Sequence, residues 1–338
     1  MTDSLQFRPN CLNKDRIRLW IPASSSAHTL PLALHNKKLH VLLSSVREST
    51  RNTYGTGLAC YHLFCDKYKL PWSNRAPASP ELISAFVAYL AGHYSASSIN
   101  NYLSGVRLWH LVHSQPWRIN QTELHSLLRG ARLLQPQPKQ QRQPLLLKDI
   151  QAIMQKLELD KPLPAAAFAC LTTTFFSCAR LGEFTILTLK SFNPNKYITP
   201  NGVSVIQDIK GESTTTFHLP QTKTNPFGEN VYWKSQPFSC DPEKALINHL
   251  VVNKPLPHHH LFSYKVKGKH RPLTRNAFLV TIKEAAQKAG IAFHFGHSLR
   301  IGGTLEYLIR GVPLEVIKRQ GRGNLMLLLY IYATMLKY

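Results

Sequence analysis

Hydrophobic positions recur with helical spacing in the first third of the chain. The positions that share one helix face are Leu58, Tyr61, Phe64, Cys65 and Tyr68. Ser79 followed by Pro80 marks another helix start, because serine caps helices and proline fits their first position. Further helices are expected after Ser95 or Ser97 and over Thr122–Leu133. This pattern predicts an all-α bundle.

The distribution of proline and polar residues divides the chain into four stretches. Residues 1–35 lack periodicity and are expected to form a flexible arm, and residues 36–134 hold the helical bundle. The segment QPQPKQQRQP cannot bury a core, so residues 135–145 are expected to form a basic linker. That linker would either follow a phosphate backbone or act as an ordinary spacer. Residues 146–338 then form a second domain.

The second domain mixes helical and strand patterns. The apolar run Pro164–Arg180 predicts a buried helix. Short strands are expected over Val203–Ile209, Thr215–Leu219 and Glu229–Trp233, with a turn at residues 225–228. Further helices are expected over Leu147–Leu157, Thr274–Ala289, Leu305–Arg310, Pro313–Arg319 and Met326–Leu336. The expected fold class is an N-terminal all-α helical bundle plus a C-terminal mixed α+β domain that is mainly α.

Charge narrows the classes of function. With 41 Lys and Arg against 18 Asp and Glu, the formal net charge is +23. A chain this basic favours a nucleic-acid partner, because each neutralised phosphate releases a counterion. No apolar run is long enough to span a bilayer and no secretory signal opens the chain, so no membrane partner is expected. The six cysteines never form CxxC, which argues against a zinc ribbon and fits reduced thiols inside a cell.

Several charged residues have the chemistry of an anion site. His297 and Arg300 share a helix face, where arginine offers a bidentate fork and histidine a donor or a proton. Arg180 is expected to end the long apolar helix, with Glu183 three residues later. Lys223 lies just before the expected hairpin turn. Each of these residues, taken alone, also fits a structural or surface role.

The order of these residues resembles the catalytic series of the tyrosine recombinase (phage-integrase-like) family. That series runs Arg-x-x-Glu, a hairpin Lys, His-x-x-Arg, a further basic residue and a late Tyr, here Arg322 and Tyr330. The stretch GHSLRIGGTLEYLIRGVPLEVIKRQGR is similar to recombinases of fungal mobile elements. STRNTYGTGLACYHLFC and SSINNYLSGVRLWH resemble the family's DNA-clamping helical domain. The resemblance covers roughly residues 40–336.

The resemblance implies a tyrosine nucleophile that leaves a 3′-phosphotyrosine and a free 5′-hydroxyl, after which the 5′-hydroxyl of another strand reseals the DNA. Arg180 and Arg300 would neutralise the non-bridging oxygens, so no metal and no other cofactor is expected. Lys223 would protonate the leaving oxygen and His297 would assist proton transfer. Glu183 would orient the cluster.

Two departures from the family pattern bear on activity. The box Gly321–Gly323, which supplies catalytic Arg322, lacks the tryptophan of fungal relatives. The family spacing ends at Ile331, and a one-residue deletion brings it to Tyr330, with Tyr332 as the alternative nucleophile. A shortened helix could hold the phenol out of line. The alternative functions are therefore a catalytically decayed or domesticated DNA-binding relative, and a type IB topoisomerase-like enzyme that cleaves and religates strands.

DNA contacts are expected from both domains, mainly to the sugar–phosphate backbone. In the bundle the candidates are Arg47, Arg51, Tyr54, Asn100, Asn101, Arg107 and His110. In the second domain Lys265, Lys267, Lys269 and Arg271 would form either a phosphate rail or a solvated loop. Residues 258–260, three histidines, are expected to belong to a basic loop rather than to a metal site. The resemblance implies double-stranded DNA as partner, self-association on DNA as a dimer to tetramer, and a nuclear location if the source is eukaryotic.

Overall fold

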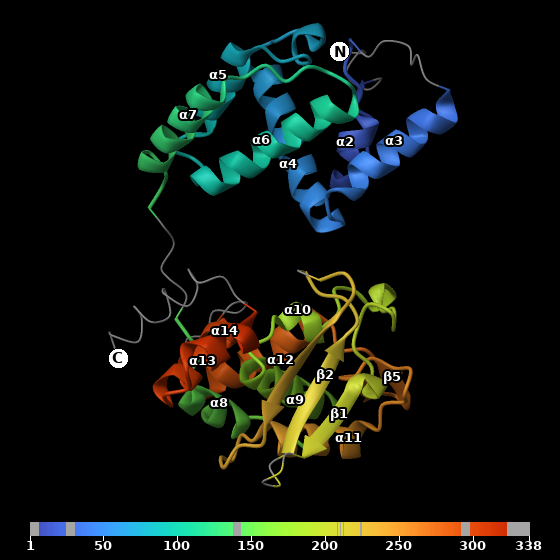
Figure 1. Cartoon of the computed structure of the whole chain (residues 1–338), viewed down its shortest axis with the longest axis vertical. Coiled ribbons are helices and arrows are strands. Elements are labelled where there is room, and N and C mark those ends of the chain that lie inside the picture. The colour runs from blue at the N-terminus through green and yellow to red at the C-terminus, as the bar shows by residue number, and fades with distance from the viewer. Residues whose placement is uncertain are drawn as a thin grey trace. The chain divides into compact units, whose positions relative to one another are not determined.

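The structure, a computed structural model, describes residues 7–24, 31–137, 143–207, 209, 211, 213–223, 225–291 and 298–322. The chain divides into two compact units, Met1–Gln140 and Gln141–Tyr338 (Figure 1). The division falls within the stretch expected to be a linker, of which residues 138–142 lie outside the described residues. Each unit has its own apolar core.

The N-terminal unit is helical, as predicted. Its longer helices are α3 (Leu32–Ser44), α4 (Glu48–Lys67), α5 (Pro80–Leu90), α6 (Ala96–Val112) and α7 (Gln121–Leu133). Ser79 caps α5 by accepting a hydrogen bond from the amide of Leu82, and Pro80 occupies the first helical position, as expected. Ser95, and not Ser97, caps α6.

Glycines let α4 and α6 approach closely in this unit. A Cβ added at Gly57 would lie 2.5 Å from the Cα of Tyr102, and one at Gly105 would lie 2.4 Å from the carbonyl oxygen of Tyr54. Only a residue without a Cβ fits either contact. The two helices whose sequences resemble a DNA-clamping domain are therefore packed directly against each other.

Part of the expected flexible arm is folded. Residues 13–15 form a 3₁₀ turn and α2 spans Arg16–Leu19, with Ile17 fully buried. The turn lies so close to α4 that a Cβ at Gly55 would come within 1.7 Å of the carbonyl oxygen of Asn13. Trp109 donates from its indole nitrogen to the carbonyl of Trp20 at 2.6 Å. A four-residue helix is too short to show periodicity, which is why the sequence reading missed it.

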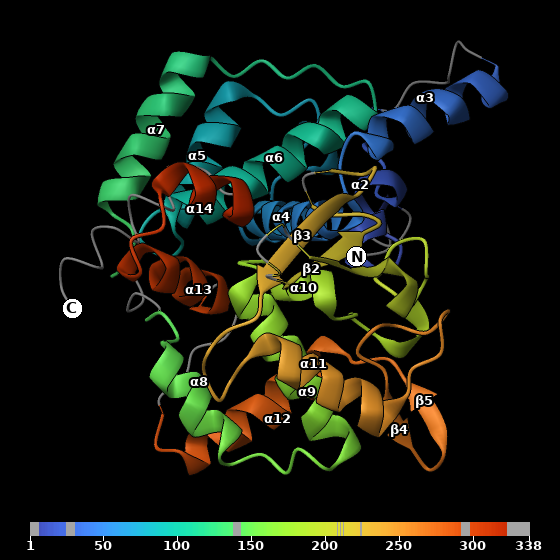
Figure 2. The same cartoon turned by 60° about the horizontal axis from the view of Figure 1, so that its bottom comes forward.

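The C-terminal unit is built around α9 (Pro162–Phe176), whose residues from Ala165 onward are all buried. A helix that is apolar on every side belongs in a core, as the sequence predicted. Its neighbours include α11 (Pro242–Asn253), α12 (Arg275–Lys288) and α13 (Ser298–Ile309) (Figure 2). Further α-helices among the described residues are α8 (Leu147–Met154), α10 (Leu181–Phe184) and α14 (Leu314–Gly321).

A small antiparallel sheet with the order β1-β2-β3 completes this unit. Its strands are Val203–Gln207, Ser213–Leu219 and Glu229–Lys234, close to the predicted stretches. Leu219 pairs with Glu229, so residues 220–223 and 225–228 lie at one end of the sheet. Phe217 and Trp233 of this sheet are buried in the same core as α9.

Three features of the C-terminal unit differ from the sequence reading. α9 ends at Phe176 instead of Arg180. α11 was not predicted, and the expected basic loop is a second hairpin of β4 (Tyr264–Val266) and β5 (Lys269–Arg271). Its turn residues Lys267 and Gly268 both have positive φ, as a tight hairpin turn requires. The predicted helix over Met326–Leu336 lies outside the described residues.

Candidate active site

Arg180 is held at a chain reversal directly after α9. Cys178 has a φ of 49°, which turns the chain out of the helix. The amide of Arg180 then donates to Oε2 of Glu183 at 2.9 Å, and its Nη1 donates to Oε1 of the same carboxylate at 3.0 Å. Glu183 lies three residues away at the start of α10 and is buried. The predicted pairing of these two residues is therefore present, although Arg180 lies beyond the helix and not at its last turn.

Arg300 reaches the same region because α13 packs tightly against its neighbours. A Cβ at Gly303 would lie 2.0 Å from the carbonyl oxygen of Phe175 in α9, and one at Gly302 would lie 1.9 Å from that of Leu145. The amide of Leu145 also donates to the carbonyl of Ser298 at 3.2 Å. The Gly-Gly pair is thus a requirement of close packing, and it fixes the position of the helix that carries Arg300.

Arg300 is buried, with 4% of the residue exposed, and its guanidinium lies among like charges. Burial lowers its pKa, and the nearby charges of Arg180 and Arg322 lower it further, while Glu183 opposes the shift. A cluster of guanidinium groups at this depth is electrostatically unfavourable unless anions offset it. The protein supplies part of that offset with carboxylates, and a bound anion would supply the rest.

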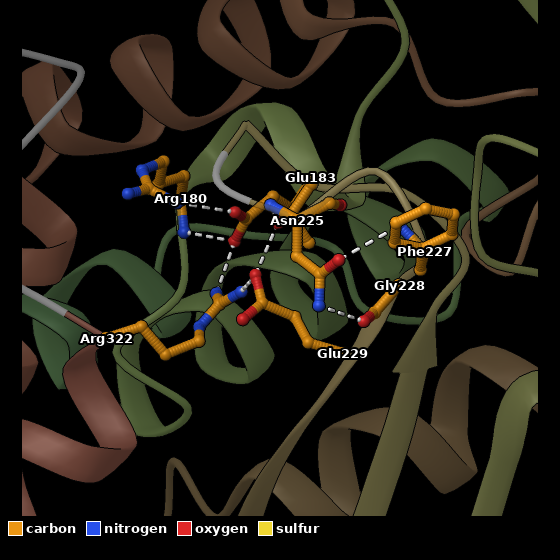
Figure 3. Close-up of polar contacts among 8 residues, drawn as sticks. Arg180, Glu183, Asn225, Phe227, Gly228, Glu229 and Arg322 are labelled. Carbon is orange, nitrogen blue, oxygen red and sulfur yellow. Dashed lines mark hydrogen bonds and ion pairs between the residues drawn. The ribbon is translucent and has the colours of Figure 1, made fainter.

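Arg322 forms the centre of the network drawn in Figure 3. Its Nη2 donates to Oε2 of Glu183 at 2.6 Å and its Nη1 donates to Oε1 of Glu229 at 2.5 Å. The residue follows α14 in a left-handed conformation, with φ of 46°. α14 is itself fixed to the end of α9, because Nε2 of Gln320 donates to the carbonyl of Phe176 at 2.8 Å. The two carboxylates hold the planar fork of Arg322 in one orientation.

Glu229 begins β3 and also accepts a hydrogen bond from the hydroxyl of Thr222. Burial raises the pKa of Glu229, but the hydrogen bond from Thr222 and the charge of Arg322 outweigh burial, and the net pKa is lowered. Thr222 precedes Lys223, which is exposed in the turn between β2 and β3. The predicted hairpin lysine therefore lies one residue from a side chain of the network.

The network brings together most of the predicted catalytic residues that the structure describes. Arg180 and Glu183, from the start of α10, interact with Arg300 and Arg322, which come from much later in the sequence. The other predicted members, His297, Tyr330 and Tyr332, lie outside the described residues. Three guanidinium groups face two carboxylates here, so the cluster keeps an excess of positive charge that suits a phosphodiester.

Sequence reasoning missed Glu229. A glutamate at the first position of a strand resembles any solvated strand end, and its partner Arg322 is far away in the sequence. The one available signal was the scarcity of acidic residues in this chain, which has 18 Asp and Glu in all. Because acidic residues are so few, Glu229, six positions after the candidate catalytic lysine, could have been named as a candidate site residue.

The predicted DNA contacts of the N-terminal unit divide into exposed and buried groups. Exposed side chains are those of Arg47, Asn100, Asn101 and Arg107. Arg51 and Tyr54 are half-buried, and Nη1 of Arg51 donates to the carbonyl of Leu43 at 3.0 Å.

His110 requires a correction, because its ring is fully buried. Nε2 accepts from the amide of Ala78 at 3.0 Å and Nδ1 pairs with the carbonyl of Val106 at 2.8 Å. Both ring nitrogens are used inside the protein. This histidine holds α6 to the segment before α5 and cannot contact DNA.

The basic cluster of the second unit lies on the β4–β5 hairpin. Lys267, Lys269 and Arg271 are exposed and Lys265 is half-buried. Of the neighbouring histidines, His260 is buried, with its ring against Phe192 and Tyr197. Across the described stretches, no group of three His, Cys, Asp or Glu side chains could hold a metal ion. Within the same stretches, no helix combines the length and apolar character that crossing a bilayer requires.

Comparison with solved structures identifies the fold. The chain is similar to the XerH site-specific recombinase bound to a palindromic difH substrate in a post-cleavage complex, with 14% identity and a TM-score of 0.54 over 94% of this chain and 92% of that chain. Lower scores are found for XerA recombinase (14% identity, 89% and 98% coverage, TM-score 0.34) and a Flpe–Holliday junction complex (12% identity, 88% and 78% coverage, TM-score 0.38). Neither a protein-family sequence model nor a curated protein sequence matches the chain. The likeness to XerH shows the fold of tyrosine recombinases, with a helical unit followed by a mixed α+β unit, as predicted.

Proposed function

We propose that the chain is a site-specific DNA recombinase that cuts and rejoins strands through a 3′-phosphotyrosine. The observation that carries the proposal is the network of Arg180, Arg300 and Arg322 with Glu183 and Glu229. One buried and two half-buried guanidinium groups with an excess of positive charge suit the phosphate of a DNA backbone. The fold shared with XerH supports the same reading.

The proposed chemistry follows from charge and proton balance. The phenol oxygen of Tyr330, or of Tyr332 in the alternative, forms a bond to phosphorus while the bond from phosphorus to the 5′-oxygen breaks. Arg180 and Arg300 stabilise the negative charge that grows on the non-bridging oxygens. Lys223 gives a proton to the leaving 5′-oxygen, and His297 assists transfer of the proton that the phenol loses as it bonds to phosphorus. In rejoining, a 5′-hydroxyl loses its proton and bonds to phosphorus, while the bond from phosphorus to the phenol oxygen breaks and that oxygen regains a proton. Protein cations carry the charge in this scheme, so it needs no metal ion.

Binding would involve both units. Exposed Arg47, Asn100, Asn101 and Arg107 are candidates for backbone contacts in the first unit, and the basic β4–β5 hairpin is a candidate in the second. Strand exchange needs two DNA sites, which would require self-association on DNA as a dimer to tetramer. The motif resemblance to recombinases of fungal mobile elements supports an element-borne enzyme that acts in a nucleus.

The test is covalent trapping. Nicked suicide duplexes from a random-sequence pool are incubated with the protein in EDTA, and denaturant-resistant protein–DNA adducts are counted. We expect adducts for the wild type and for Tyr332→Phe, and none for Tyr330→Phe. Loss in Tyr332→Phe alone keeps the chemistry and moves the nucleophile.

Two alternatives give different results in the same experiment. A decayed DNA-binding relative binds the pool with strong salt dependence but forms no adduct. A type IB topoisomerase-like enzyme forms the adduct and relaxes supercoiled DNA, but it produces no four-way junctions from paired sites. The recombinase proposal predicts both adducts and junctions.

A further inference from the structure

We propose that Glu229 is a positioning residue that couples the phosphate-binding arginines to the turn that carries the general acid. The inference rests on the proposed function, because Lys223 is a general acid only within that chemistry. It assigns a role to Glu229 and to Thr222, neither of which belongs to the catalytic series that the sequence suggests.

A single carboxylate oxygen of Glu229 connects the arginine cluster to the turn that carries Lys223. Oε1 of Glu229 accepts from Nη1 of Arg322 at 2.5 Å and also from the hydroxyl of Thr222. Arg322 in turn donates to Glu183, whose other oxygen accepts from Arg180. The contacts therefore run without a break from Arg180 through Glu183 and Arg322 to Glu229 (Figure 3), and from Glu229 on to Thr222.

Thr222 transmits this contact to the backbone of the turn. Its hydroxyl accepts from the amide of Asn225 at 3.0 Å, and its own amide donates to the carbonyl of Asn225 at 2.9 Å. The Asn225 side chain continues the pattern: Nδ2 donates to the carbonyl of Gly228 at 2.7 Å, and Oδ1 accepts from the amide of Phe227 at 2.9 Å. The described residues of the turn are thus tied together by hydrogen bonds, and the contact of Thr222 with Glu229 fixes them relative to Arg322.

A purely structural role for Glu229 would be to offset the charge of Arg322. That role predicts equal damage to every substrate, because phosphate stabilisation is needed for any leaving group. A positioning role for the turn predicts something further. When the Glu229 carboxylate or the Thr222 hydroxyl is removed, the turn that carries Lys223 loses its contact with Arg322. Proton transfer from Lys223 to the leaving oxygen is then the step that slows most.

A substrate with sulfur in place of the bridging 5′-oxygen separates these roles. In the normal step the phenol oxygen bonds to phosphorus, the bond to the 5′-oxygen breaks and that oxygen takes a proton from Lys223. With sulfur, the phosphorus–sulfur bond breaks instead and leaves a thiolate, which is stable enough to depart without a proton. Rescue by sulfur therefore reports loss of the general acid and not loss of phosphate stabilisation.

The experiment measures single-turnover cleavage of oxygen and sulfur versions of the duplexes that wild type captures covalently. The variants are Glu229→Gln and Thr222→Val, with Lys223→Ala as the general-acid reference. Glu158→Gln, which removes an exposed carboxylate elsewhere in the same unit, is the matched control. Thr222→Val replaces the hydroxyl by a methyl group of similar size, so it decides the question if Glu229→Gln does not fold.

We expect both variants to lose about 10- to 100-fold on the oxygen substrate, as displaced supporting residues do, and to recover most of that loss on sulfur. Lys223→Ala should show the same rescue, and Glu158→Gln should match the wild type on both substrates. Equal losses on oxygen and sulfur, or no loss at all, would overturn the positioning role and leave the proposed function standing. A wild-type chain that cleaves neither substrate would contradict the proposed function and this inference together.

Discussion

Replacing Gly303 by alanine should misplace the helix that carries Arg300. The added Cβ would lie 2.0 Å from the carbonyl oxygen of Phe175 and 3.0 Å from its carbonyl carbon. Both atoms belong to the backbone of α9, so neither can rotate away as a side chain could. Non-bonded atoms prefer separations near 3.5 Å, and α13 must therefore move by about 1 Å or more.

The magnitude of the effect follows from this overlap. Overpacking of this kind costs about 1–3 kcal/mol, and sometimes more. Arg300 lies on the same helix, less than one turn before Gly303, so its guanidinium moves with the backbone. A misplacement of about 1 Å at a catalytic group can reduce the rate by about 100-fold. We therefore expect a large loss of adduct formation together with a moderate loss of stability.

Hydrogen exchange read by mass spectrometry measures the stability change locally. Peptides from α9 and α13 should exchange about tenfold faster or more, which corresponds to ~1.4 kcal/mol, while peptides from α4 act as the internal reference. Gly130→Ala is the matched control, because Gly130 lies within α7 with no atom near the added methyl. It should stabilise the first unit by roughly 0.5–1 kcal/mol. If Gly303→Ala kept wild-type exchange and activity, the close packing of α13 on α9 would be refuted.

Two further predictions concern charge. Arg300→Lys keeps the charge but loses the planar fork, so single-turnover adduct formation should fall by about 10²–10³-fold while filter-binding affinity for DNA changes little; equal losses in both would contradict a catalytic role. Burial lowers the pKa of His110 to about 4, so the neutral form of His110 stabilises the folded unit. This contribution to the free energy of unfolding is about 3 kcal/mol; it is complete above the ordinary histidine pKa and is lost as the pH falls from about 6.5 to 4. Urea unfolding across this range should show a shallower pH slope in His110→Leu, and an unchanged slope would contradict the burial argument.

Local signals in the sequence account for much of the fold. Ser79-Pro80 marked the start of α5, the apolar run after Pro164 marked the buried α9, and alternation marked β2 and β3. These elements follow from the order of nearby residues, which is what periodicity and capping report. α2 and α11 were missed because α2 is four residues long and α11 lacks a clear apolar stripe.

The residues of the site that belong to an ordered motif could be predicted from the sequence. Those that join it through contacts between distant parts of the chain could not. Arg180 and Glu183 are three residues apart, so their pairing was visible in the sequence. Glu229 meets Arg322 across 93 positions, and nothing local distinguishes it from a surface glutamate. His110 shows the opposite error: a histidine on a helix expected to face DNA suggested a contact, but its position on the buried side of α6 decides its role.

The most direct test of the central claim is to identify the residue that carries DNA in a trapped adduct. After nuclease and trypsin treatment, the peptide of residues 323–337 contains both Tyr330 and Tyr332, and fragmentation by tandem mass spectrometry separates them. The proposed function predicts a 3′-phosphonucleotide on Tyr330, formed in EDTA and absent from Tyr330→Phe. A chain that binds the same duplexes but carries no nucleotide on any tyrosine would contradict it.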